Sequence, residues 1–412
     1  MAIRALRSLA QGLFVVDFTL FLKASGWGAA PIGALLTAEG LVGAGLMLAV
    51  GILCDRYGRR VFLLAYQALV VLGMIALVLA PLPWTLVLVA VVLSLGRGAN
   101  GSAGPFGPAE QAWLALAVPH RLRARAFSLN NAVTYVGMGI GAGLAGTVAI
   151  FAHILPGPRE YLPIFVLTGV IAVVNGLQVW SLREERPAAS RPQRRDQPPP
   201  PPPPSVADPA LRRAQNGAIL RLMVVNGINA LAIGMVGPLI PYWFSVRFGI
   251  GPATIGPIYA GTFVVTAVAS ILTGDLAART GIVRAVVVTR MFGVALMAAL
   301  PLLPTYGLAA GAYALRSMAN RGSAGARNAL GVSIAGDERR GFAASLNGLS
   351  MRLPSAIGPA LGGWLFSLGN LELPFFLAAG LQLVFLVVFG LALRDVEALG
   401  ARADGPSVEG AT

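Results

Sequence analysis

The stretch that decides the fold is Gly51-Ile52-Leu53-Cys54-Asp55-Arg56-Tyr57-Gly58-Arg59-Arg60. It is a short charged segment between two long apolar runs, at roughly 30–50 and 61–80. Each run has about the 20 residues that a helix needs to cross the hydrocarbon of a bilayer. Gly58 suits a tight turn with positive φ, and clustered arginines anchor a loop in water. The stretch therefore predicts a short loop between two transmembrane helices.

Composition extends this prediction to the whole chain. Of its 412 residues, 56% are hydrophobic and only 12% are charged, and the mean hydropathy is +0.74. A soluble domain carries about 25% charged residues. A surface this poor in charge suits a protein that lipid surrounds.

Apolar runs long enough to span recur along the chain, and we expect an all-α integral membrane protein with twelve transmembrane helices in two six-helix bundles. The predicted spans are roughly 5–23, 30–50, 61–80, 84–115, 125–153, 161–182, 216–246, 252–274, 283–303, 306–333, 342–368 and 373–394.

The domain boundaries follow from a change in composition between spans six and seven. Residues 183–215 are rich in arginine and include seven consecutive prolines, Pro198 to Pro204. Polyproline has no internal hydrogen bonds and stays solvated, so it predicts a linker; docking of a proline-reading domain is the alternative. We expect bundles at 1–182 and 216–396 and a disordered tail at 397–412.

The net charge of +14 raises the possibility of nucleic-acid binding, which needs a basic face on a soluble fold. Here the basic residues lie in short bursts between apolar runs. Most of the 31 fall in loops on the side of the termini, while the opposite side holds only Lys23, Arg159 and Arg247. The positive-inside rule then predicts a multi-pass protein of the inner (plasma) membrane with both termini in the cytoplasm, and no nucleic-acid partner.

Cofactor and enzyme chemistry find little support in the sequence. Cys54 is the single cysteine, and His120 and His153 lie far apart with no metal-ligand spacing. No catalytic Ser/His/Asp pattern or phosphate-binding loop occurs. We therefore expect no cofactor, no metal, no catalytic residue and no enzymatic activity.

Short motifs repeat in the two halves in the same order. Ala99-Asn100-Gly101-Ser102 resembles Ala319-Asn320-Arg321-Gly322-Ser323 with one insertion, and Ser128-Leu129-Asn130 matches Ser345-Leu346-Asn347. At the same offset, Gly141 and Gly146 align with Gly358 and Gly363. Repeated six-helix halves are typical of alternating-access carriers with a site between the halves.

The loop at residues 51–60 resembles the signature Gly-x-x-x-Asp-Arg-x-Gly-Arg-Arg/Lys of the major facilitator superfamily, with every position filled. The resemblance extends over nearly the whole chain through the helix count, linker and repeat. It implies alternating-access transport by a monomer in the lipid bilayer. It also implies a gating role for the loop residues, listed with the partner acid: Gly51, Asp55, Arg56, Gly58, Arg59, Arg60 and Glu110. In this role Asp55 faces helix 11 and Arg59 pairs with Glu110; topology anchoring by the arginines is the alternative.

Buried charges in the first half suggest proton coupling. Charges at mid-membrane are costly and usually face a cavity or a partner. Asp17 and Arg97 lie near the middle third of spans one and four, and Glu39 lies deep in span two. Arg97 followed by Gly101 resembles a family motif linked to proton transfer. Asp17 either exchanges protons or forms a structural ion pair with Arg97.

The candidates for the substrate cavity are polar or aromatic residues at similar depth: Asn100, Tyr135, Asn226, Asn229, Arg316, Asn320 and Arg352. Each asparagine either contacts substrate or hydrogen-bonds a neighbouring helix. Tyr135 either lines the cavity or faces lipid or another helix. An anionic substrate would use some of the arginines.

Residues 137–146 carry a glycine pattern that resembles the antiporter motif of the family, with Ala142 in place of its proline; glycine for close helix packing is the alternative. With Asp17 and Arg97, this pattern favours proton-coupled efflux of small organic compounds. Uptake of a nutrient or organic anion is the first alternative, and a non-transporting receptor or scaffold is the second.

The predicted topology has a direct test. A reporter that is active only in the cytoplasm, fused after Thr412, is expected to be active. The same reporter inserted after Arg159, in a predicted outer loop, is the control and is expected to be inactive. Activity of the second fusion alone would invert the topology.

Overall fold

The computed structural model describes residues 2–96, 118, 123–181, 209–280, 282–322 and 340–403, and these residues are almost entirely helical. The first half contains α1 (Ala2–Ala24), α2 (Ala29–Tyr57), α3 (Arg59–Leu79), α4 (Pro83–Leu93), α6 (Arg123–Ala145), α7 (Val148–Phe151), the 3₁₀ turn η3 (Gly157–Tyr161) and α8 (Leu162–Ser181).

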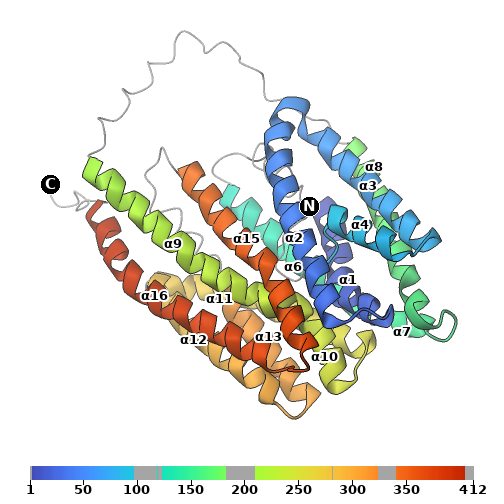
Figure 1. Cartoon of the computed structure of the whole chain (residues 1–412). Coiled ribbons are helices and arrows are strands. Elements are labelled where there is room, and N and C mark those ends of the chain that lie inside the picture. The colour runs from blue at the N-terminus through green and yellow to red at the C-terminus, as the bar shows by residue number, and fades with distance from the viewer. Residues whose placement is uncertain are drawn as a thin grey trace, which may run out of the picture.

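The second half repeats this layout. It contains α9 (Pro209–Val236), the 3₁₀ turn η4 (Gly237–Leu239), α10 (Ile240–Phe248), α11 (Pro252–Thr280), α12 (Ile282–Ala299), η5 (Leu300–Leu302), α13 (Tyr306–Gly322), α15 (Arg340–Ser367) and α16 (Leu373–Ala403). The two halves lie side by side, coloured blue to green and yellow-green to red (Figure 1).

Seven helical segments in the described part are long and apolar enough to cross a membrane, and three shorter apolar helices accompany them. Many large apolar side chains are exposed along them, such as Leu72, Leu177 and Val387. This surface suits lipid and supports the prediction of an all-α membrane protein of two pseudo-symmetric bundles. Below, the ends at which α1 joins α2 and α10 joins α11 are called the outer ends, a name that follows the topology predicted from the sequence.

Within each bundle, the first helix packs on the fifth through a glycine. A Cβ added to Gly12 of α1 would overlap the carbonyl oxygen of Met138 in α6. A Cβ added to Gly234 of α9 would overlap the carbonyl oxygen of Ser355 in α15. Met138 and Ser355 correspond in the repeat, so the two halves share one backbone contact as well as one helix order.

Between the bundles, the same relationship occurs with the second helix of each half. Gly33 of α2 lies against the carbonyl oxygen of Pro359 in α15, and Gly256 of α11 lies against that of Ala142 in α6. Ala142 and Pro359 are again equivalent positions. The α2–α15 and α6–α11 pairs therefore join the halves around a pseudo-two-fold axis.

Two predicted spans are interrupted. The span expected at 84–115 is wrong at residue 94, because α4 ends at Leu93 and Ser94 is left-handed at φ 54°. The N–H of Gly96 donates to Glu39 Oε2 at 2.8 Å, and a Cβ at Gly96 would strike Phe18 and Leu36. A side chain at residue 96 would therefore require Phe18 and Leu36 to move.

The span expected at 216–246 breaks at the η4 turn, where Gly237 and Pro238 separate α9 from α10. Proline lacks the N–H that an unbroken helix would use, and it clashes with the preceding turn. The break redirects the outer end of this span, which is the part that meets the first half.

The glycine contact within the second bundle can be tested by substitution. Gly234→Ala is expected to destabilise the protein by about 1–3 kcal/mol, because the new methyl group displaces α15. Gly380→Ala, whose Cβ would meet no atom within 4 Å, is the matched control and is expected to be neutral or slightly stabilising. Thermal unfolding in detergent measures both; equal melting temperatures would contradict the assignment.

Candidate transport site between the halves

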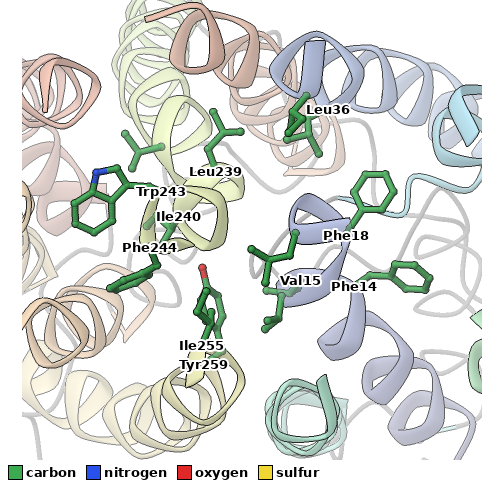
Figure 2. Close-up of a cluster of buried hydrophobic side chains, with 14 of the residues drawn as sticks. Phe14, Val15, Phe18, Leu36, Leu239, Ile240, Trp243, Phe244, Ile255 and Tyr259 are labelled. Carbon is green, nitrogen blue, oxygen red and sulfur yellow. The ribbon is translucent and has the colours of Figure 1, made fainter. Parts of the chain in front are cut away.

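The outer ends of the two halves meet in an apolar cluster. Figure 2 shows Val15 of α1 facing Ile240 of α10 and Tyr259 of α11, with Phe18 and Leu36 beside it on the side of the first half. All five side chains are buried. Their packing closes the interface around α1, α10 and α11.

Two hydrogen bonds between the halves accompany this cluster. Lys23 Nζ donates to Ser245 Oγ at 2.7 Å, which joins the outer ends of α1 and α10. The N–H of Ala360 donates to Thr37 Oγ1 at 2.9 Å, which joins α15 to α2. The halves are therefore held together on the outer side of the interface.

An aromatic and cationic group lies further along the interface. Tyr135 of α6 packs on Phe263 of α11, with ring centroids 6.4 Å apart. The Arg321 guanidinium lies 5.2 Å from the centre of the same Phe263 ring. Tyr135, a predicted cavity residue, thus contacts the second half directly.

The predicted cavity residue Arg316 lies deeper in the second half. Its side chain is 5% exposed, and its electrostatic neighbours are Tyr313, Tyr259 and Arg321. The Tyr259 and Tyr313 rings are 5.1 Å apart. These two arginines and three rings form one group, which we call the arginine–aromatic group: Arg316, Arg321, Tyr259, Phe263 and Tyr313.

The asparagines of α9 have different surroundings. Arg290 Nη1 donates to Asn229 Oδ1 at 2.6 Å, and the Arg290 guanidinium lies 5.1 Å from the Phe385 ring centre. Asn229 therefore joins α9 to α12, the structural alternative of the two predicted roles. Asn226 is buried on the same helix.

The remaining predicted cavity residues are less closely grouped. Asn320 is half-buried and lies against Gly293 of α12, and Arg352 is half-buried on α15. Asn100 lies outside the described residues, as do Arg97 and Glu110.

Asp17 faces the interior of the first bundle and not the interface between halves. It lies on the same side of α1 as Phe14 and Phe21, which pack on Phe165 of α8 at 6.0 and 5.0 Å between ring centroids. Its side chain is 2% exposed and interacts electrostatically with Glu160 of η3. Among the described residues, none donates a hydrogen bond to either Asp17 oxygen.

Glu39, the third predicted coupling residue, is fully buried and accepts the Gly96 N–H. Its main-chain oxygen also receives the Ser94 hydroxyl at 3.5 Å. These contacts give Glu39 a structural role at the end of α4, since they hold the left-handed turn.

In the loop that resembles the family signature, Gly58 has φ 89°, which confirms the predicted turn between α2 and α3. Arg60 donates to the carbonyl oxygen of Trp180 in α8 and lies over its ring at 5.8 Å. Arg60 thus ties α3 to α8 within its own half, as an anchor would. The side chains of Gly51, Asp55, Arg56 and Arg59 are outside the described set, and their gating role stays a prediction.

The glycines of residues 137–146 pack closely, which was the alternative interpretation of that pattern. A Cβ at Gly141 would overlap the carbonyl oxygen of Leu9 in α1, and one at Gly143 would lie 3.7 Å from the Ala260 Cβ of α11. One face of α6 thus packs on α1 of its own bundle, and another packs on α11 of the other half.

Two features escaped sequence reasoning. The first is the aromatic part of the arginine–aromatic group, because Tyr259, Phe263 and Tyr313 look like ordinary lipid-facing aromatics in apolar spans. The available signals were the four-residue spacing of Tyr259 and Phe263 and the three-residue spacing of Tyr313 and Arg316, each of which places two side chains on one helix face.

The second is a cavity of about 60 Å³ with a mixed polar and apolar lining inside the first bundle, between α1, α3, α4 and α8. Its lining includes Arg7, Gln11, Gln67, Thr168 and Asn175. These side chains come from distant parts of the chain, so no local sequence pattern predicts the cavity.

Comparison with known sequences decides the family. The sequence model of the Major Facilitator Superfamily matches residues 1–221 and 222–407, one match for each half. This chain belongs to the major facilitator superfamily. The family consists of membrane transporters, so transport of small molecules across a membrane is its function.

Solved structures share the fold of this superfamily member at low identity. A bacterial homologue of the human lysosomal transporter Spinster, inward-facing and unoccupied, is 17% identical with a TM-score of 0.68, covering 97% of this chain and 92% of the other. The nucleoside transporter NupG is 12% identical with a TM-score of 0.69, covering 95% and 98%. A bacterial homologue of the iron transporter ferroportin, inward-facing, is 15% identical with a TM-score of 0.71, covering 95% and 97%. No curated protein sequence matches the chain.

The α6–α11 contact between halves can be locked covalently. In a Cys54→Ser background, Gly143→Cys and Ala260→Cys are expected to form a disulfide, because their Cβ atoms would lie 3.7 Å apart, near the mean of about 3.8 Å for disulfides. Since alternating access requires the halves to separate on each side in turn, transport in vesicles is expected to fall to background and to return on reduction.

Each single cysteine variant is the control and is expected to transport in both redox states. A cross-linked protein that transported at the full rate would show that this contact does not open during the cycle.

Proposed function

We propose that this chain is a proton-coupled secondary transporter that exports small organic compounds by alternating access. The observation that carries the proton coupling is the Asp17 carboxyl, which is buried and receives no hydrogen bond from a described residue. A charge in such a place is costly, and in membrane proteins it usually marks an ion or proton pathway.

The surroundings of Asp17 support a proton route within the first bundle. Toward the outer end lies Glu160, which hydrogen-bonds with Tyr161 beside it. Toward the inner end lies Phe14, stacked on Phe165, and Phe14 also lines the cavity of the first bundle. Asp17 thus lies between Glu160 and this cavity, with one aromatic pair separating it from the cavity.

The cavity has the properties of a hydrated space. Buried Thr168 Oγ1 and Asn175 Oδ1 face no hydrogen-bond partner among the described residues. A buried water needs a volume of at least about 10–15 Å³ and two to four polar partners; this cavity is about 60 Å³ and has polar groups in its lining. Rotation of the Phe14 ring would then connect Asp17 to water on the inner side.

The interface between halves supports alternating access. Lys23, Thr37 and the apolar cluster join the outer ends, and these contacts have to separate when the outer side opens. We further propose that both termini are cytoplasmic, that the membrane is the inner (plasma) membrane and that the protein acts as a monomer. The export direction rests on the glycine pattern of residues 137–146, which also serves close packing.

One observation favours the alternative of an organic-anion permease. The arginine–aromatic group places two cationic side chains in the second half beside the interface. Two cationic side chains favour an anionic substrate whether the protein exports or imports it.

Removal of the Asp17 charge tests the coupling. With a substrate found by thermal-shift screening, Asp17→Asn is expected to reduce accumulation driven by a pH gradient to the level of empty vesicles. Exchange of substrate for substrate without a gradient is expected to continue, because that reaction needs no net proton transfer. Transport is measured in reconstituted vesicles with labelled substrate.

Glu372→Gln, which removes an acid from the turn before α16, is the matched control and is expected to leave gradient-driven transport intact. Gradient-driven accumulation by Asp17→Asn at the wild-type level would remove Asp17 from the coupling mechanism.

A further inference from the structure

Two arginines of α13 lie near each other in the second half. Arg316 is 5% exposed, Arg321 is half-buried, and each is an electrostatic neighbour of the other. The buried nitrogen atoms Arg316 Nε and Arg321 Nη1 donate to no acceptor in the described structure. Like charges repel, so the pair is unfavourable without a counter-charge.

No described carboxylate supplies that counter-charge. Among the side chains of the second half that the structure describes, Glu372 is the sole acid, and it lies at the outer end before α16. The neighbours that Arg316 does have besides Arg321 are Tyr313 and Tyr259, whose side chains end in hydroxyl groups and not carboxylates.

Other buried arginines of the chain show what a structural arginine looks like here. Arg290 donates to Asn229 at 2.6 Å, and Arg4 Nε donates to Thr134 Oγ1 at 2.7 Å. Each joins two helices through a direct hydrogen bond. Arg316 Nε makes no such bond with a described residue, although Arg316 is as deeply buried as Arg4.

The pair lies beside the interface between the halves. Arg321 contacts Phe263 of α11, and Phe263 contacts Tyr135 of the other half. Tyr259 and Phe263 rings lie 6.4 Å apart along α11. The aromatic rings beside the arginines therefore extend from α11 across the interface to α6 of the other half.

We propose that the arginine–aromatic group binds an organic anion, whose carboxylate, sulfonate or phosphate group lies on Arg316 and Arg321 and whose apolar body packs on Tyr259, Phe263 and Tyr135. Guanidinium groups bind the oxygens of such anions through paired N–H donors, and aromatic faces accept a flat apolar body. The proposal rests on the proposed function, since it takes the interface to be the transport site.

Matched pairs of small probes test the inference on the purified full-length protein. Benzoate and phenyl phosphate are the anions, and benzamide is the neutral analogue of similar shape. Isothermal titration is expected to detect an anion and not benzamide. Arg316→Gln and Arg321→Gln are each expected to weaken anion binding by about tenfold or more, the value of one charge-assisted hydrogen bond.

Arg247→Gln is the charge-matched control, because Arg247 is exposed at the end of α10 and its replacement removes the same net charge. The anion affinity of this variant is expected to equal that of the wild type. If the Arg316→Gln variant fails to fold, Arg321→Gln alone tests the proposal, because Arg321 is only half-buried and its replacement disturbs packing less. Equal binding of benzamide, absence of binding by both anions, or wild-type affinity in Arg321→Gln would each overturn the proposal.

Failure of this inference differs from failure of the proposed function. If screening finds a neutral or cationic substrate whose transport follows the pH gradient in the Arg321→Gln variant, transport stands and the anion site falls. If an anion binds through the two arginines but vesicles show no transport of it, the site stands and the transport assignment of this site falls.

Discussion

Close backbone contact at glycine is the constraint on which the rest of the structure depends. Lipid offers no hydrophobic drive for helix association, so these helices associate where small residues let backbones touch. Gly12 and Gly234 bring the first helix of each half onto the fifth, and Gly33 and Gly256 bring the second helix of each half onto the fifth helix of the other. One type of contact therefore builds both bundles and the interface between them.

The close glycine contacts between the halves limit where a functional site can lie. The α6–α11 and α2–α15 pairs hold the halves at a short distance, and the side chains between them are then forced to share a narrow space. Tyr135 meets Phe263 for this reason, and Arg321 covers the same ring. The interface is thus glycine-lined where backbones touch and carries large aromatic and cationic side chains elsewhere.

The fold was predictable because its signals are local: apolar runs of membrane length, a charged loop with a turn glycine, and repeated motifs. The breaks at Ser94 and Gly237 were missed, since a left-handed turn held by Glu39 depends on a contact between distant helices. The direction of Asp17 was also missed. Residues on every side of α1 are apolar, so periodicity does not reveal which face meets the other half. Arg316 and Tyr135 were predicted, whereas their aromatic partners carry no polar signal.

The separation of Asp17 from the arginines constrains any coupled mechanism. Asp17 faces the interior of the first bundle, while Val15, two residues earlier on α1, faces Tyr259 (Figure 2). Tyr259 is in turn a neighbour of Arg316. Asp17 therefore does not contact the proposed anion site directly. It lies, however, on α1, the helix whose Val15 packs against Tyr259 of that site. On the proposed mechanism, coupling passes through movement of α1 as a rigid element, which displaces Val15 against Tyr259 and so links proton loading to the arginine–aromatic group.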